Sequence, residues 1–333
     1  MILVTGGAGF IGSQIVEALA AAGAEVRVLD RRAARPRPGV DVMVGDVRDA
    51  DTVARALRGV TGISHQAARV GLEASPSDVA GYVEDNDAGT AVPLQAMAER
   101  RFRGRLVLGS SMVVYGEGRY ACERHGAVRP PPRAERDLRA GRFDPACPRC
   151  GGPLAPRPIP EDAPTDPRNV YAATKLHQEQ LCSIFGHQTG VPVTVLRYHN
   201  VYGPGMPRAT RYAGVAARFA DALRCGRAPR VTEDGRQLRD FVHVRDVARA
   251  NVLALTAPEP VGGVFNVCSG RPRTVGEIAA ALHAALGGPE PEVTGEYRAG
   301  DVRHVFADAT AAARTLGFRA REELADGIAE LAA

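Results

Sequence analysis

The hydrophobic residues of this chain fall into short runs, and longer stretches with helical spacing separate these runs. Such an alternation predicts an α/β fold, in which helices cover both faces of a parallel sheet. The pattern is typical of a Rossmann-type, doubly wound sheet. Strands are predicted at residues 1–5, 25–30, 41–44, 61–65, 105–110 and 192–198. Helices are predicted at about 10–22, 49–58, 77–100 and 169–187.

Residues 118–160 interrupt the alternation. They contain three consecutive prolines at 130–132, many arginines and three of the six cysteines, without sustained periodicity. Because a loop of this length is uncommon inside a compact domain, we expect either a separately stabilised insert or a flexible segment. After residue 200 the elements become shorter and mixed, which predicts a smaller C-terminal lobe built on the sheet. The expected division is a first domain of 1–199 with 238–268, the insert 118–160 within it, and a lobe of 200–237 with 269–333.

Composition and charge exclude several classes of protein. The 333 residues include 42 basic and 38 acidic side chains, for a net charge of +4. This balance provides no basic stripe for nucleic acid, although arginines suit the phosphates of a small anionic ligand. No apolar run approaches the roughly 18–20 residues of a membrane span, and the start MILVTGGAGFIG is typical of a strand and turn and not of a signal peptide. We therefore expect a cytoplasmic protein with reduced cysteines.

Three glycines follow the first predicted strand at regular spacing. Gly6, Gly9 and Gly12 form the pattern G-x-x-G-x-x-G and lead into a predicted helix. Glycine is needed there because the turn is tight, a pyrophosphate approaches the backbone N–H groups, and the helix packs closely on the strand. Asp30 ends the second apolar run, where a carboxylate would hold the ribose hydroxyls of adenosine. Together these residues predict a dinucleotide-binding site.

The residues that follow the second and third strands bear on the choice of dinucleotide. A carboxylate at Asp30 repels a 2′-phosphate and favours NAD over NADP, whereas Arg31 and Arg32 could accept that phosphate. Asp46 ends the third strand and would contact adenine, cap the next helix, or do both. NAD is the predicted cofactor, with NADP as the alternative.

Tyr171 and Lys175 are candidates for acid–base chemistry. They lie four residues apart in Y-A-A-T-K on a predicted helix, and this spacing places them on one face. Tyrosine has an ordinary pKa of about 10, and a neighbouring ammonium group lowers that pKa by stabilising the phenolate. Ser110 and Ser111 lie at the end of a predicted strand and begin the motif S-S-M-V-V-Y-G. This end of the strand is the edge of the sheet where these folds place their chemistry.

These motifs together resemble those of one family. The sequence is similar to the extended short-chain dehydrogenases/reductases, specifically the NAD-dependent nucleotide-sugar epimerases and dehydratases. The resemblance covers nearly the whole chain except 118–160. Besides the glycine turn and YAATK, it rests on HQAA (65–68), NDAGT (86–90), SSMVVYG (110–116), RYHNVYGPG (197–205), RDFVHVRDVA (239–248) and YRAGDVRHVFAD (297–308).

The resemblance implies roles for individual residues. Tyr171 would be the catalytic acid and base, Lys175 its electrostatic partner and a ligand of the nicotinamide ribose, and Ser111 a hydrogen-bond partner of the reacting sugar oxygen. The residues implied in cofactor binding are Gly6, Gly9, Phe10, Ile11, Gly12, Asp30, Arg31, Asp46, Val47, Ala67, Ala68, Asn86, Tyr171, Lys175 and His199.

The resemblance also assigns the substrate's diphosphate and nucleotide to Asn200, Arg239 and Arg298. Arginine is suited to this role because a guanidinium group pairs with two phosphate oxygens at once. A cysteine-bearing insert resembles that of dTDP-L-rhamnose 4-epimerases, which implies a dTDP-6-deoxyhexose as the first candidate among dTDP- and UDP-hexoses. Family members also imply a homodimer, formed through helices at about 83–100 and 170–187.

The residues that follow Ser111 restrict which of the family's reactions we expect. Family dehydratases resemble T-D-E-V-Y-G there, and their Asp and Glu remove water, whereas this chain has Met112 and Val113, which cannot transfer protons. Related decarboxylating enzymes keep the glutamate that Val113 replaces. We therefore expect epimerisation of a nucleotide-diphosphate sugar, with C4 as the expected centre. A keto-sugar reductase that consumes NADPH and a catalytically silent NAD-binding protein are the alternatives.

The insert contains four potential metal ligands. Cys122-x-x-His125 and Cys147-x-x-Cys150 have ligand spacing, and C-P-R-C-G-G resembles the knuckle of a zinc ribbon. Three thiolates and one imidazole would complete a closed tetrahedral site for structural zinc, and the metal would allow a segment without its own core to fold. A disulfide or four unrelated residues are the alternatives. The other cysteines are expected to fill the core: Cys182, Cys225 and Cys268.

The two ends of the insert lie beside the predicted active site. It begins just after Ser111 and Tyr115 and ends just before Tyr171. We therefore expect it to form a lid or to shape the sugar pocket.

Overall fold

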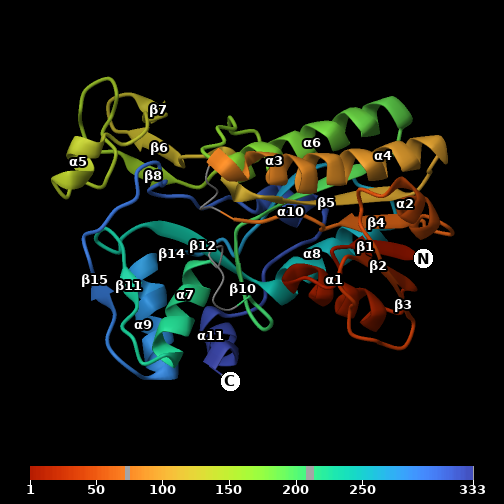
Figure 1. Cartoon of the computed structure of the whole chain (residues 1–333). Helices are drawn as coiled ribbons and strands as arrows, with labels where there is room; N and C mark the ends of the chain where they lie inside the picture. The colour runs from red at the N-terminus through yellow and green to blue at the C-terminus, as the bar shows by residue number, and fades with distance from the viewer. Residues whose placement is uncertain (72–75, 208–213, 333) are drawn as a thin grey trace.

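A computed structural model of the chain describes residues 1–71, 76–207 and 214–332 (Figure 1). It confirms the predicted α/β architecture, because seven parallel strands form one sheet in the order β13-β9-β5-β4-β1-β2-β3. Six of these strands begin and end within one residue of the predicted positions, and β13 is a strand that the alternation did not single out. The strands are β1 (Ile2–Thr5), β2 (Val26–Asp30), β3 (Val40–Val44), β4 (Gly62–His65), β5 (Arg105–Ser111), β9 (Val193–Tyr198) and β13 (Gly263–Val267).

Helices cover both faces of this sheet, and each face has its own apolar core (Figure 1). On one face lie α1 (Phe10–Ala21), α8 (Val244–Thr256) and α10 (Thr310–Thr315). On the other lie α2 (Ala50–Ala56), α3 (Val79–Tyr82), a π-helical turn (Val83–Ala88), α4 (Gly89–Glu99) and α6 (Val170–Thr189). Two 3₁₀ turns, Pro76–Asp78 and Met112–Tyr115, complete the first half of the chain. In the described ranges, no helix is both long and apolar enough to cross a membrane.

The strand order places a crevice at the centre of the sheet. From β1 the chain builds outward to β2 and β3 on one side, and then continues from β4 to β5, β9 and β13 on the other. In open parallel sheets, ligands bind outside the carboxyl ends of the strands where the order reverses. The fold therefore directs the search for a site to the ends of β1 and β4.

The second lobe packs around an apolar cluster of its own. Its helices are α7 (Val215–Arg224), α9 (Val275–Leu286) and α11 (Leu324–Ala332). Its short strands are β10 (Asn200–Tyr202), β11 (Arg230–Val231), β12 (Leu238–His243), β14 (Pro272–Thr274) and β15 (Glu292–Val293). Residues 208–213, which belong to the predicted range 200–237, lie outside the described residues.

The insert has secondary structure of its own. Three short antiparallel strands pair in the order β7-β6-β8, and one short helix follows β7. Figure 1 shows this unit at one end of the molecule, against the second lobe and away from β3. The elements are β6 (Arg119–Cys122), β7 (Gly126–Val128), α5 (Glu135–Arg139) and β8 (Ala155–Arg157).

Candidate active site

A cavity of about 810 Å³ lies at the carboxyl ends of the central strands. Its volume is in the upper part of the range of about 300–1,000 Å³ that is common for small-molecule sites. Residues from the ends of β1, β2, β3, β4, β5 and β9 line it, together with Tyr171 of α6. The predicted site residues that line it are Gly6, Gly9, Phe10, Ile11, Gly12, Asp30, Arg31, Asp46, Val47, Ala67, Ala68, Ser111, Tyr171, His199 and Asn200.

The glycine turn leaves no room for side chains. Gly6 has a φ of +68°, and a Cβ atom on Gly12 would lie 2.1 Å from the carbonyl oxygen of Gly6. The Asp30 carboxylate is fixed beside the turn, because it accepts hydrogen bonds from the backbone N–H groups of Ala8 at 3.0 Å and Arg32 at 2.9 Å. A bare backbone cradle followed by a carboxylate at the end of β2 fits the pyrophosphate and ribose of a dinucleotide.

The charged residues near Asp30 are already paired with the protein. Arg31 donates to the carboxylate of Asp85 at 3.2 Å. Asp46 accepts from the guanidinium of Arg48 at 2.7 Å, and this hydrogen bond lowers the pKa of the Asp46 carboxyl. The prediction that Asp46 caps the next helix is wrong, because α2 begins at Ala50 and its capping side chain is Asp49.

The helix α6 holds the two predicted acid–base residues. The side chain of Asn169 caps its N-terminus by accepting from the N–H of Ala172 at 2.8 Å. Tyr171 and Lys175 are both buried. Lys175 does not line the cavity, because its Nζ donates to the carbonyl oxygen of Gly109 on β5 at 2.5 Å.

Burial dominates the protonation of this pair. It raises the pKa of the Tyr171 phenol to about 12, although a hydrogen bond with Ser111 acts in the opposite direction. It lowers the pKa of Lys175 to about 8. The predicted lowering of the Tyr171 pKa by the ammonium group of Lys175 is therefore not found: burial raises this pKa, and the hydrogen bond with Ser111 is what lowers it.

Two buried histidines near the cavity are neutral. Burial lowers the pKa of both His65 and His199 to about 3. His65 bridges Thr5 of β1 and Thr90 of α4 through its two ring nitrogens, whereas His199 faces the cavity. An uncharged imidazole therefore lies at the end of β9.

Asn86 lies behind the cavity wall. Its amide donates to the carbonyl oxygen of Arg69 at 3.0 Å and to the hydroxyl of Thr174 at 2.9 Å, and its oxygen accepts from the N–H of Arg69 at 2.7 Å. It therefore joins the loop after β4 to α6. Because Asn86 does not line the cavity, it could influence a bound cofactor only through Arg69 and Thr174.

A buried ion pair behind α6 was not predicted from the sequence. Arg197 of β9 pairs with Glu179 at 2.7 Å, and Glu179 also accepts from the hydroxyl of Ser110 at 2.5 Å. Glu179 follows Tyr171 and Lys175 at four-residue spacing, so its place on the same helix face was available as a signal. The ion pair joins α6 to β5 and β9 directly beneath the site.

Two predicted substrate residues lie away from the cavity. Arg239 and Arg298 are not among its lining residues. The guanidinium of Arg239 donates to the backbone oxygens of Leu238, Val302 and Arg303, each at 2.8 Å. The roles assigned to Arg239 and Arg298 remain predictions.

The four predicted metal ligands converge. The donor atoms of Cys122, His125, Cys147 and Cys150 all lie within 4.8 Å of one another. The Sγ atoms of Cys122 and Cys150 are 3.7 Å apart, and Nδ1 of His125 lies 3.5 Å from the Sγ atoms of both Cys122 and Cys147. A tetrahedron with zinc–sulfur bonds of about 2.3 Å and a zinc–nitrogen bond of about 2.0 Å has edges of about 3.8 and 3.5 Å. Three of the six donor pairs therefore have the spacing of a tetrahedral zinc site, and thiolates with an imidazole are donors that suit zinc.

Of the three cysteines outside the cluster, one does not fill the core as expected. All six are free, so the disulfide alternative is wrong for this structure. Cys182 and Cys268 are buried, as predicted. Cys225 is exposed, because it follows the last turn of α7 at the surface.

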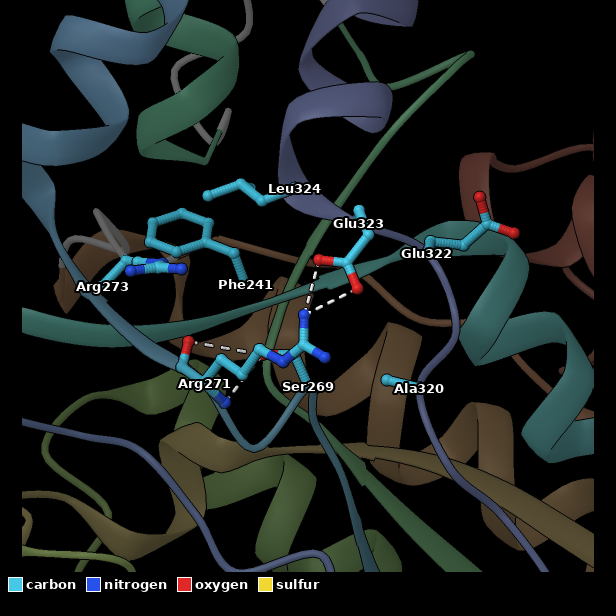
Figure 2. Close-up of a pocket in the computed structure, with 8 residues that line it drawn as sticks. All are labelled: Phe241, Ser269, Arg271, Arg273, Ala320, Glu322, Glu323 and Leu324. Atoms are coloured by element: carbon cyan, nitrogen blue, oxygen red, sulfur yellow. Dashed lines mark hydrogen bonds and ion pairs between the residues drawn. The ribbon is translucent and has the colours of Figure 1, made fainter.

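A second hollow can be excluded as the site. Its volume is about 30 Å³, which is room for a few water molecules at most. Figure 2 shows the guanidinium of Arg271 directed at both carboxylate oxygens of Glu323, at 2.7 and 2.5 Å. This ion pair lies across the hollow between β14 and the start of α11.

A family model and a curated relative both match this chain over most of its length. The model of the NAD dependent epimerase/dehydratase family matches residues 2–135 and 150–268, and the gap at 136–149 falls in the insert. A dTDP-L-rhamnose 4-epimerase of Burkholderia thailandensis is 34% identical over 343 residues, which cover 99% of this chain and 93% of that enzyme.

Solved structures agree with this family. A UDP-glucose 4-epimerase of Thermus thermophilus in complex with NAD has a TM-score of 0.78 at 32% identity, covering 99% of this chain and 97% of that one. MoeE5 in complex with UDP-glucuronic acid and NAD has a TM-score of 0.79 at 29% identity, covering 99% and 96%. The chain belongs to the NAD dependent epimerase/dehydratase family.

Proposed function

We propose that this protein is an NAD-dependent epimerase that inverts C4 of a nucleotide-diphosphate sugar through a transient keto-sugar. One observation carries the proposal: a single cavity joins the dinucleotide cradle to Ser111 and Tyr171, while Met112 and Val113 stand where dehydratases have their acid and base. The 4-epimerases among the relatives support the same reaction.

The residues of this chain divide the chemistry in a simple way. NAD, when bound, supplies the acceptor and donor of hydride. Tyr171 takes the hydroxyl proton as a phenolate and returns it as a phenol, and Ser111 orients the same sugar oxygen. The Ser111 hydrogen bond favours the phenolate, against the burial that raises the Tyr171 pKa. Met112 and Val113 offer no proton donor or acceptor to the keto-sugar and exclude water from it. The site therefore has the residues that the redox cycle needs, but no acid or base for the elimination of water.

Proton NMR tests the proposed reaction. Purified protein would be incubated with dTDP- and UDP-hexoses, including dTDP-L-rhamnose, without added cofactor. A C4-inverted product is expected, since a cycle without net redox change needs only the cofactor that stays bound. Stoichiometric oxidation of added NADPH with a keto-sugar, and no inversion, would contradict epimerisation and support a reductase.

The carboxylates around the adenosine end support NAD over NADP. Asp30 is fixed at the glycine turn, and Asp85 also lines the cavity, where it engages Arg31. A 2′-phosphate there would meet both carboxylates. Arg32 is directed to the carbonyl oxygen of Ala8.

The substrate proposed first is a dTDP-6-deoxyhexose. The dTDP-L-rhamnose 4-epimerase relative supports this choice, and so does the apolar lining supplied by Val70, Met112, Val113 and Met206. A methyl group at C5 gains from such a surface, whereas a hydroxymethyl or carboxylate group loses hydrogen bonds to water there.

Structural zinc is proposed for the four-ligand cluster in the insert. The support is the convergence of the four donors and the match of three donor spacings to a tetrahedral Cys₃His site. The thiolates require a reducing compartment, in agreement with the cytoplasmic location expected from the sequence.

The two-domain division of the chain is likewise proposed. Residues 1–199 with 238–268 would form the NAD-binding domain, and 200–237 with 269–333 the substrate-binding lobe. Two elements depart from this division: β12 pairs with β10 and β14 of the lobe, and α10 packs on the seven-stranded sheet. The support is that β13 completes the seven-stranded sheet, whereas α7, α9 and α11 share a separate apolar cluster.

A homodimer through residues 83–100 and α6 is proposed from exposed apolar side chains. Val83 is 44% exposed and Ile184 is 54% exposed, on neighbouring helical segments of one face (Figure 1). We expect Ile184→Glu to convert a dimer into a monomer, because the interface would have to bury a charge. Light scattering after size-exclusion chromatography measures this change. Val293→Glu, at an exposed valine of the second lobe, is the control, and a mass unchanged in both variants would contradict the proposed face.

A further inference from the structure

Arg303 is the centre of a charge cluster between the insert and the second lobe. Its side chain is fully buried. Nε donates to Asp144 of the insert at 2.7 Å, and the terminal nitrogens donate to Glu233 at 2.8 Å and to Asp234 at 2.7 and 2.9 Å. One guanidinium group therefore ties the insert to the turn that follows β11.

The insert supplies a second arginine to the same turn. Arg133, whose side chain is only 4% exposed, pairs with the carboxylate of Glu233 at 2.8 Å and donates to the backbone oxygen of Asp301 at 2.7 Å. Glu233 is thus held between one arginine of the insert and one of the lobe. Its φ of +54° is a left-handed conformation that side-chain-bearing residues adopt rarely. Such a conformation persists only where the surrounding contacts enforce it.

Glu117, immediately before the insert, binds the same segment of the second lobe around Arg303. The carboxylate of Glu117 accepts from the backbone N–H of Arg303 at 2.9 Å and from the hydroxyl of Tyr120 at 2.6 Å. His304 contacts Asp144 at 3.2 Å through Nε2, while its Nδ1 accepts from the N–H of Leu238. We call Arg133, Asp144, Glu233 and Arg303 the insert clasp.

The clasp connects to the cavity through the lobe's short strands. Val305 donates to the backbone oxygen of Leu238 at 3.0 Å, at the start of β12. β12 pairs in parallel with β10, with Phe241 opposite Asn200. Asn200 lines the cavity, whereas no residue of 118–160 does. The expectation of a lid is therefore not met among the described residues, because the insert docks on the lobe and not over the cavity.

We infer that the insert clasp positions the nucleotide-binding side of the second lobe, so that Arg133 and Asp144 set substrate affinity without touching the substrate. The inference rests on the proposed function for the identity of the ligand. Arg133 and Asp144 are positioning residues, which act through segment 297–304 and through β12 and β10. The cofactor cradle at β1 and β2 lies outside this chain of contacts.

Arg133→Met tests the inference, with dTDP and UDP as probes in calorimetry. The variant is expected to raise the Kd of the nucleotide diphosphate, and the KM of the nucleotide sugar, by about 2- to 30-fold, the range for residues that act through packed neighbours. Turnover at saturation, bound NAD and zinc content should stay near wild type. Arg133→Lys should recover part of the affinity, because it keeps a cation for Glu233.

Hydrogen exchange gives a readout that does not depend on turnover. Backbone amides of 297–304 should exchange faster in Arg133→Met, because loss of buried contacts makes local opening easier. Arg142→Met is the matched control. It removes an exposed arginine of the insert that pairs with Asp137 within the insert, and it should change neither exchange nor affinity.

The outcomes separate this inference from the proposed function. Unchanged Kd and unchanged exchange in Arg133→Met would overturn the clasp even if the wild-type protein epimerises sugars. A wild-type protein that turns over no sugar would defeat the proposed function, while faster exchange at 297–304 would still support the clasp. If Arg133→Met does not fold, Asp144→Ala replaces it, with a smaller effect in the same direction because the Asp144 side chain is 66% exposed.

Discussion

Replacing Tyr171 with phenylalanine is expected to lower kcat by about 10²- to 10⁴-fold, the usual contribution of a positioned proton donor and acceptor. The phenol hydroxyl is the only group removed, and the ring can keep its packing in α6 and its contact with Tyr82, 6.2 Å away between ring centres. The substituted protein should therefore fold and keep its cofactor. Single-turnover and steady-state NMR assays with the accepted nucleotide sugar would measure the loss.

Tyr82→Phe is the control for this substitution. It removes a phenol hydroxyl from the same buried neighbourhood, where Tyr82 hydrogen-bonds to the carbonyl oxygen of Gly71. It should keep most of the activity, because Tyr82 does not line the cavity. Near-normal turnover by Tyr171→Phe, with NAD bound, would remove the basis of the proposed mechanism.

Cys147→Ser is expected to reduce zinc from about one ion per chain to nearly none, because a closed structural site needs all four ligands. In zinc-finger peptides the metal contributes about 10–16 kcal/mol of binding free energy that is also folding free energy. No residue of the short strands β6, β7 and β8 belongs to one of the hydrophobic core clusters of the described residues. We therefore expect the insert to become sensitive to proteases. Elemental analysis and limited proteolysis measure the two effects.

The exposed Cys225 provides a matched control for the zinc site. Cys225→Ser removes a thiol that lies outside the cluster, so zinc content and protease resistance should match the wild type. Wild-type protein with an intact, protease-resistant insert and well under one zinc per chain would argue against the metal. So would a Cys147→Ser variant that retains its zinc.

The sequence by itself determined six of the seven strands of the sheet, the helices on one of its faces together with α1, and half of the cavity lining. Strand positions followed from short apolar runs, and the cradle followed from Gly6, Gly9 and Gly12, because each depends on neighbours close in the chain. The metal cluster was predicted for the same reason: its four donors occur as two pairs at three-residue spacing, and only the meeting of the pairs required the fold.

Only the tertiary structure decided the features that depend on burial or on distant residues. The raised pKa of Tyr171 comes from desolvation, which no spacing reveals. The predicted cap at Asp46 failed because Arg48 takes its carboxylate, which leaves the cap to Asp49. The insert clasp brings Arg133 to Glu233 and Asp144 to Arg303, pairs separated by 100 and 159 residues. In a sequence such charged groups are expected to be solvated at the surface. Only the three-dimensional packing shows that all four are paired and that Arg133, Glu233 and Arg303 are buried.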